Sequence, residues 1–370
     1  MSARRENSEV PSDRKVKSGE FAKMMKWVGY ATAILSLAGA IGGIGKAIWN
    51  RAEAHRKAIS VRVETHSELD NTIAAAQLEA GARDYPSAWK SLDDALKIDP
   101  SSAKLHSAQE DLAMKWLDDE IHAGPGGKFS AITEKLKPVL VRGATASKPG
   151  PHRADLLAHI GWCYFLEYRD QALDSNPAAA AEYAKAAEED PNNPYAQAMW
   201  GHWLLWGQQD VLEAKKHFAA ALASHREMDY VRRMQLSALL NHHNREVDTE
   251  VVRVANAMRK EQQTVNADET RRIFEMYYSE IDPWAQLPVK FVNAVPPEEH
   301  VETFHWLFDK VRLDDSKSVE RSYYLAVLED VAGRRDEALA TYRSVQSKEP
   351  EGAIRQAVDA GIKRLSKNSE

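Results

Sequence analysis

Apolar residues recur every three or four positions along most of the chain, a spacing that places them on one face of an α-helix. The stretch from Glu298 to Lys310, for example, is apolar at Val301, Phe304, Leu307 and Phe308. The sequence contains no convincing run of alternating β-branched residues, which would indicate strands. The pattern therefore predicts an all-α protein.

One segment departs from this period because it is apolar throughout. Residues 27–45 read WVGYATAILSLAGAIGGIG, nineteen residues without a charge, between Lys26 and Lys46. At about 1.5 Å per residue, such a helix just crosses a hydrocarbon core of roughly 30 Å. We predict one transmembrane helix over residues 27–49, which follows a polar N-terminal tail, residues 1–26.

Two further interpretations of this segment stay open. Ala38-Gly39-Ala40 resembles a signal-peptide processing site, although the apolar run continues past it and the leading polar region is 26 residues long. Gly39 and Gly43 form a pair of small residues four positions apart, which would let two such helices pack closely and make the array a spacer in an oligomer. Lys and Arg are slightly more numerous before the segment, which favours a cytoplasmic N-terminus and an extracytoplasmic array.

Beyond the apolar segment, a pattern of small and bulky residues repeats with a period near 34 residues. Its copies are Ala88, Leu92, Ala95 and Pro100; Ala179, Tyr183, Ala186 and Pro191; Ala214, Phe218 and Ala221; and Ala338, Tyr342, Val345 and Pro350. The small residues let two helices approach, the bulky residue fills the gap between them, and proline ends the helix.

These copies resemble the second helices of tetratricopeptide repeats. Matching first-helix residues are Leu157, Ile160, Gly161 and Tyr164 in one copy, and Trp200, Gly201 and Leu204 in the next. The resemblance implies an irregular α-solenoid with repeats over residues 69–225, degenerate helical pairs over 226–318, and a last repeat with an end helix over 319–370. A juxtamembrane helix is expected at residues 50–68. Arg226 departs from the family pattern because it replaces a proline.

Tetratricopeptide repeats bind protein segments, so the resemblance, together with the predicted transmembrane helix, implies a membrane-anchored scaffold or adapter without catalysis. On the repeat alignment, the candidates for a peptide groove on the concave surface are Trp162, Phe165, Tyr195, His202 and Trp206. Such rings supply a large contact area at low entropic cost. Packing of the same rings on neighbouring repeats is the alternative. The Lys and Asn residues with which related co-chaperones hold a terminal carboxylate are missing from the matching positions.

Charge and candidate chemistry narrow the function further. The net charge of −6 argues against a nucleic acid as the main partner. Cys163 is the only cysteine, which excludes an intrachain disulfide and a cysteine metal cluster. The adjacent His242 and His243 point to different faces of a helix, and no HExxH or other catalytic motif is present. We predict no cofactor and no metal. An enzyme or regulatory subunit with a site in residues 226–318 is the alternative.

Overall fold

The fold is that of a computed structural model of the chain, which describes residues 68–120, 128–171, 177–242, 245–276, 286–313 and 315–367. The chain divides into two compact units, Met1–Ala75 and Ala76–Glu370. The predicted transmembrane helix, the pair Gly39 and Gly43, and all but the last residue of the juxtamembrane segment lie outside the described residues. Of the helices that are described, none has the length and apolar character needed to cross a membrane.

The regular structure of the described residues is helical throughout. After a helix at residues 68–81 come α3 (Tyr85–Ile98), α4 (Ala103–Glu120), α5 (Ser130–Ala146), α6 (Pro151–Asp170), α7 (Pro177–Glu189), α8 (Pro194–Trp203), the π-helix η1 (Leu204–Gln208) and α9 (Val211–Ala223). The second half contains α10 (Met228–Asn241), α11 (Arg245–Lys260), α12 (Ala267–Met276), α13 (Gln286–Ala294), the 3-10 helix η2 (Pro297–Glu299), α14 (His300–Phe308), α15 (Asp315–Val331), α16 (Arg335–Gln346) and α17 (Gly352–Lys367).

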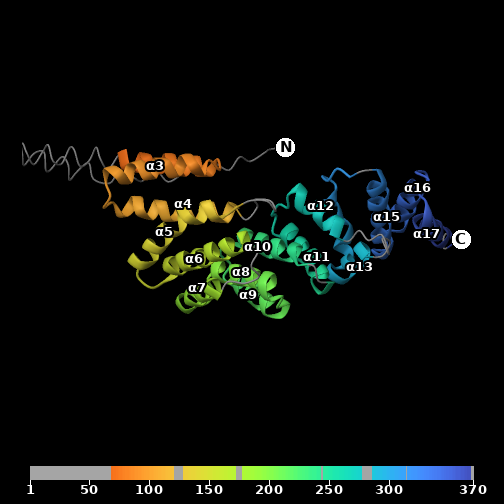
Figure 1. Cartoon of the computed structure of the whole chain (residues 1–370). Coiled ribbons are helices and arrows are strands. Elements are labelled where there is room, and N and C mark those ends of the chain that lie inside the picture. Colours follow the sequence, from red (N-terminus) through yellow and green to blue (C-terminus); the bar gives the residue numbers. More distant parts are fainter. Residues whose placement is uncertain are drawn as a thin grey trace, which may run out of the picture. The chain divides into compact units, whose positions relative to one another are not determined.

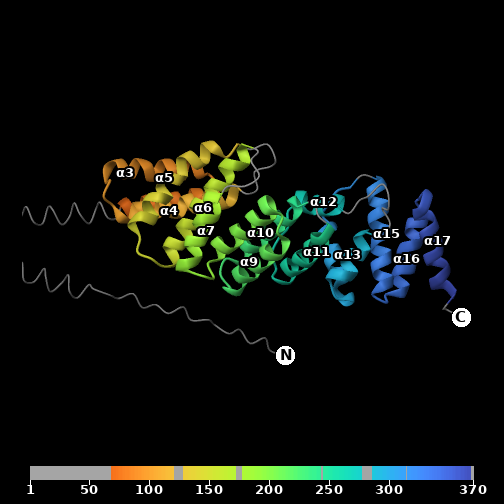
Figure 2. The same ribbon diagram turned by 60° about the horizontal axis from the view of Figure 1, so that its bottom comes forward.

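Helices of the unit Ala76–Glu370 pack as hairpins of sequence neighbours (Figures 1 and 2). Helix α6 packs on α7, α8 on α9, α10 on α11, and α15 on α16. The first helices of successive hairpins also contact each other, α6 with α8 and α8 with α10. One row of first helices, α4, α6, α8 and α10, therefore forms a continuous surface, and the candidate site lies on it.

Close approach within two of the hairpins depends on glycine opposite an aromatic ring. Tyr183 and Phe218 are buried, as the small–bulky pattern predicts. A Cβ atom added to Gly161 would lie 2.6 Å from Cε1 of Tyr183, and one added to Gly201 would lie 3.0 Å from Cε2 of Phe218. Because these distances are shorter than ordinary van der Waals contact, glycine is needed where α6 meets α7 and where α8 meets α9.

Polar contacts fix the junction between α6 and α8. The side chain of Asn193 caps α8 by accepting a hydrogen bond from the Ala196 amide at 2.9 Å, and its amide group donates to Asp155 of α6 at 2.6 Å. Arg226, which departs from the family pattern, forms an ion pair with Asp190 at 2.9 Å. The turn before α8 is therefore held from the hairpin before it and from the loop after α9.

Candidate protein-binding surface on the first helices

The candidate site begins where α8 changes into a π-helix. Residues Leu204–Gln208 form the π-helix η1, and Gln209 ends it with a left-handed φ of 54° and an amide that donates to the Leu204 carbonyl. Short π-helical turns are rare in proteins, and those that do occur are often found at functional sites. Trp206 stands in this turn and is 36% exposed. It is the one exposed aromatic side chain among the described residues.

Four of the predicted groove residues form one cluster of rings. Trp162 and Phe165 come from α6, His202 comes from α8, and Trp206 comes from η1. The Trp162 and Phe165 rings stack with centroids 4.7 Å apart, and His202 meets both edge-on at 5.2 and 5.3 Å. Trp206 meets Phe165 edge-on at 6.2 Å. The π-helical turn thus adds Trp206 to the outer side of a buried aromatic cluster.

The four rings of this cluster differ in how far they are exposed to solvent. Trp162, Phe165 and His202 are only 1%, 4% and 3% exposed. A partner can therefore reach the cluster through Trp206, while the other three rings support it from below. The assignment of a peptide groove to these residues stays a prediction.

Tyr195 lies in a different part of the same surface. Its ring packs against His159 of α6 at 4.8 Å and against Tyr230 of α10 at 4.9 Å. Tyr195 occupies a first-helix position like the other candidates, which is why the repeat alignment places it with them. It lies at the start of α8, however, whereas His202 lies near the end of that helix.

Arg169 is the charged member of the site. Its guanidinium carbon lies 4.7 Å from the ring centre of Phe129 and 5.5 Å from that of Trp206. Burial lowers the pKa of the Arg169 guanidinium, although Asp170 opposes this shift. Within the part of the chain that the structure describes, Arg169 has no ion-pair partner, and Asp170 is used to accept a hydrogen bond from the Ser130 amide at 2.7 Å. Two rings hold this cation in place, and its donor groups are available.

His202 stays neutral at physiological pH. Burial, together with repulsion from Arg169, lowers the pKa of His202 to about 3. Its Nδ1 atom and Nε1 of Trp162 are buried and have no hydrogen-bond partner in the described residues. An unpartnered buried polar atom costs about 1–3 kcal/mol. These two atoms are the unsatisfied polar groups of the cluster.

His159 has the opposite charge state. Its Nε2 lies 3.1 Å from Oδ1 of Asp118, and its Nδ1 lies 2.6 Å from the backbone carbonyl of Asp155. Burial opposes protonation, but attraction to Asp118 and the hydrogen bonds outweigh it and raise the pKa of His159. Because both neighbouring atoms are acceptors, both ring nitrogens donate and the ring is cationic. The ion pair between His159 and Asp118 holds α4 against α6, the helix that carries Trp162 and Phe165 of the aromatic cluster.

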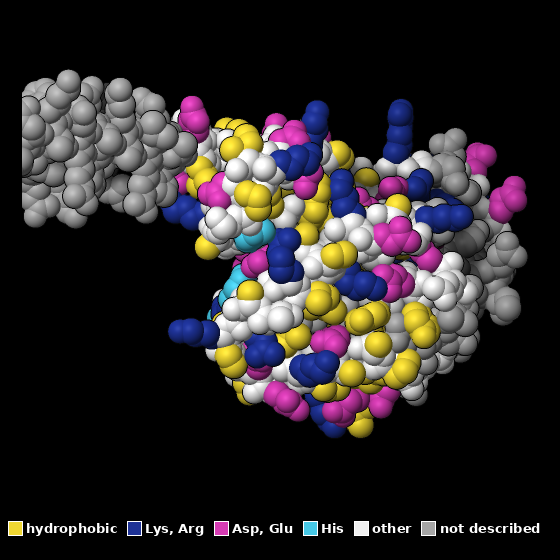
Figure 3. Space-filling view, turned by 60° about the vertical axis from the view of Figure 1, so that its left-hand side comes forward, with side chains coloured by type: hydrophobic (Ala, Val, Ile, Leu, Met, Phe, Trp, Pro, Cys, Tyr) yellow, Lys and Arg dark blue, Asp and Glu magenta, His cyan; other side chains and the backbone are white. Residues whose placement is uncertain are grey.

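The surface charges are mixed in sign. Figure 3 shows a hollowed face on which Lys and Arg side chains are interspersed with Asp and Glu, and histidine lies at the edge of the hollow. A mixed surface attracts no ligand by a single-sign field, so recognition depends on particular groups. The described residues hold no group of three His, Cys, Asp or Glu arranged to bind a metal ion.

Comparisons with known proteins identify no family. No protein-family model matches the chain, and no curated protein matches it. Among solved structures, the chain is similar to a tetratricopeptide repeat protein from Parabacteroides merdae, with 11% sequence identity and a TM-score of 0.37 over 80% of this chain and 98% of that chain. A similarity this low supports no conclusion about function. The all-helical, pairwise-packed architecture rests on the helix contacts described above.

Arg169, Phe129 and the π-helical turn were not among the predicted site residues. Arg169 stands seven residues after Trp162 on α6, so helical spacing places it near the same face. Its contact with Phe129 depends on how α5 packs on α6, which the sequence alone does not set. The segment Leu204–Gln208 contains no residue pattern that distinguishes a π-helix from an α-helix.

Proposed function

We propose that this protein is a membrane-anchored adapter that binds a segment of a partner protein on its first-helix surface, without catalysis. The observation that carries the binding part is the exposed Trp206 ring beside the guanidinium of Arg169, which forms no ion pair with any of the described residues. Tryptophan and arginine are among the residues most enriched at the energetic centres of protein interfaces. The π-helical turn that presents Trp206 is a second, independent reason to select this surface.

Together, Trp206 and Arg169 favour a partner segment in which a carboxylate lies beside an apolar side chain. A guanidinium that already lies against two rings loses little freedom when it binds a carboxylate with two parallel hydrogen bonds. The apolar side chain of the partner would cover the outer face of Trp206.

Capture of the partner from native membranes tests this proposal. We would crosslink cells that express the full chain, purify it, and compare wild type with Trp206→Ala and Arg169→Gln. Both substitutions should reduce capture at least about tenfold, because each removes a central contact. Leu212→Ala is the matched control, since Leu212 is 71% exposed on α9 and lies outside the cluster. Equal capture by all four proteins would contradict the proposal.

The anchor part of the proposal rests on the uncharged run at residues 27–45. We infer that residues 27–49 hold the array at a membrane surface. The flanking lysine and arginine residues favour an array on the extracytoplasmic side.

We propose no catalytic function for residues 226–318. In the described part of this segment, the polar side chains at the contact between α11 and α14 pair with one another. Asn256 donates to Glu299 at 3.0 Å and accepts from Thr303 at 2.8 Å, and Arg259 forms an ion pair with Glu299 at 3.1 Å. Such pairing is what two packed helices, α11 and α14, need when they bury polar side chains.

A further inference from the structure

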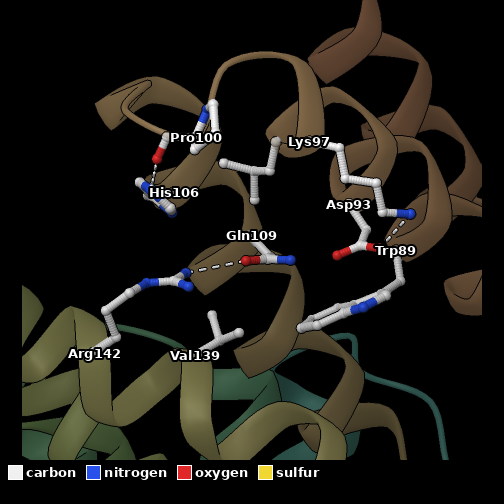
Figure 4. Close-up of a pocket in the computed structure, with 9 residues that line it drawn as sticks. Trp89, Asp93, Lys97, Pro100, His106, Gln109, Val139 and Arg142 are labelled. Atoms are coloured by element: carbon white, nitrogen blue, oxygen red, sulfur yellow. Dashed lines mark hydrogen bonds and ion pairs between the residues drawn. The ribbon is translucent and has the colours of Figure 1, made fainter.

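A pocket lies between α3, α4 and α5, near the beginning of the helical array. It has a volume of about 320 Å³ and is lined by residues of all three helices. Figure 4 shows α3 residues on one wall, α5 residues on the facing wall, and α4 residues between them. None of its lining residues belongs to the Trp206 and Arg169 site.

The floor of this pocket carries a buried donor on a fixed side chain. Gln109 of α4 is only 3% exposed, and its Oε1 accepts a hydrogen bond from Arg142 of α5 at 3.0 Å. Its amide nitrogen points away from Arg142, to the side of the pocket where Trp89 and Asp93 lie (Figure 4). The Arg142 contact therefore fixes the amide so that its N–H groups face the pocket.

An acceptor stands one helical turn before this donor. His106 is three residues before Gln109 on α4, and its Nε2 lies 2.9 Å from the Pro100 carbonyl. Because a carbonyl only accepts, Nε2 carries the hydrogen, and in the neutral ring Nδ1 is an acceptor. That Nδ1 atom is buried and has no hydrogen-bond partner in the described residues. His106 and Gln109 both line the pocket, so its floor holds one unsatisfied acceptor and one donor from α4.

The walls add one cation and an apolar patch. Lys97 already forms ion pairs with Asp93 at 3.1 Å and Asp94 at 2.8 Å. Arg142 is exposed at the rim and has no ion pair with any described residue, so it is the cation available to a ligand. Trp89 and Val139, which are 7% exposed each, supply the apolar part of the lining.

We propose that this pocket binds a short extended segment of an acidic partner protein. A peptide backbone presents an N–H and a C=O, which pair with Nδ1 of His106 and the amide of Gln109. A carboxylate side chain of the segment pairs with Arg142, and a neighbouring apolar side chain covers Trp89 and Val139. The protein would then hold two partner segments, at two separate places on its helical array.

The test uses the full chain in a mild detergent and a defined probe. The probe is acetyl-Gly-(4-fluoro-Phe)-Glu-Gly-amide at millimolar concentration, followed by the shift and broadening of its ¹⁹F NMR signal. Its neutral counterpart carries Gln in place of Glu. Binding of the acidic peptide should be saturable, and the neutral peptide should bind about tenfold more weakly because the charged hydrogen bond to Arg142 is lost.

Three variants show whether the peptide binds in this pocket. Arg142→Gln should raise the dissociation constant about tenfold. Lys115→Gln, which removes the same charge from an exposed position of α4, should leave it unchanged. Trp206→Ala should also bind normally, because that residue belongs to the first-helix site. Loss of partner capture by Trp206→Ala in cells is therefore distinguishable from loss of peptide binding in this pocket.

Four results would overturn the inference. They are no saturable binding at millimolar peptide, equal binding of the neutral peptide, wild-type binding by Arg142→Gln, and loss of binding in Trp206→Ala. Displacement of the peptide by an equal concentration of sodium glutarate would also overturn it, because the pocket would then recognise a small carboxylate and not a peptide backbone.

Discussion

Two buried histidines on the first-helix surface have opposite charge states, and their contributions to stability depend on pH in opposite ways. The pKa of His159 is raised in the folded protein, so its contribution is present below the unfolded value near 6.5 and is lost as pH rises through the folded value. The pKa of His202 is lowered to about 3, so its contribution is lost as pH falls below about 6.5.

The His202 effect is measurable with one substitution. Between pH 7 and pH 5, the unfolded chain takes up a proton at His202 that the folded chain does not. This should lower the free energy of unfolding by about 2 kcal/mol. The variant His202→Phe keeps a ring in the cluster and lacks the titrating group, so it should lose about 2 kcal/mol less than wild type over this interval. Urea unfolding of both proteins at the two pH values tests the difference, and identical losses would show that His202 titrates normally.

Gly161 is the position at which the close packing of two helices most clearly requires a residue without a side chain. A methyl group at this position would lie 2.6 Å from the buried Tyr183 ring and 3.1 Å from the Ala179 carbonyl oxygen. Overpacking of this kind costs about 1–3 kcal/mol, and the better helix propensity of alanine offsets about 1 kcal/mol. Gly161→Ala should therefore lower the free energy of unfolding by up to about 2 kcal/mol.

Gly81 provides the matched control for this substitution. No atom lies within 4 Å of a Cβ added to Gly81. Gly81→Ala should leave stability unchanged or raise it by up to about 1 kcal/mol, because only the gain in helix propensity remains. Thermal unfolding of both variants measures the two effects. A loss of stability in Gly81→Ala equal to that in Gly161→Ala would mean that glycine flexibility, and not close packing, underlies the pattern.

The helix termini differ in how much of the structure depends on them. Asp84 caps α3 through one exposed hydrogen bond of 3.3 Å to the Ser87 amide. Asn193 caps α8 and also donates to Asp155 of α6 from a fully buried position. Loss of the first cap removes one local contact. Loss of the second also removes the hydrogen bond to Asp155, whose carboxylate then has only the longer ion pair with Arg226 at 3.8 Å.

This difference predicts unequal costs for the same kind of substitution. Asp84→Ala should lower the free energy of unfolding by about 1 kcal/mol. Asn193→Ala should lower it by about 2–4 kcal/mol, because loss of the hydrogen bond to the partly buried Asp155 carboxylate adds to loss of the cap. Chemical denaturation of the two variants measures both values. Equal costs would show that the contact between Asn193 and Asp155 contributes nothing to stability.

Helices could be predicted from the sequence where their packing depends on the spacing and size of residues within one hairpin. Tyr183, Phe218 and Tyr342 are buried in the second helices where the repeat pattern places them. Pro191, which the repeat pattern places at the end of a helix, lies in the turn between α7 and α8, and Asn193 of the same turn caps α8. The role of Arg226 was not predictable, because its partner Asp190 lies 36 residues earlier and the ion pair depends on how the two loops meet.

At the scale of the whole array, the sequence predicted which residues share the first-helix surface but not how deeply each is buried. Trp162, Phe165 and His202 occupy the expected helices and contact one another. Their burial depends on the distance between α6 and α8 and on the π-helical turn, and both are set by packing between hairpins. The pocket between α3, α4 and α5 has the same origin, because its lining comes from three helices that no short motif connects.

Membrane attachment is the property of the whole molecule that the sequence predicts most directly. Deletion of residues 27–49 removes the uncharged run and should release the protein from the membrane pellet to the supernatant after alkaline carbonate extraction, whereas the full chain should stay in the pellet. Replacement of Gly39 and Gly43 by Ile keeps the segment apolar, so attachment should persist. A change in oligomer size in this variant would support close packing of two anchors. Release of the full chain by carbonate would contradict the anchor and leave the array as a separate binding module.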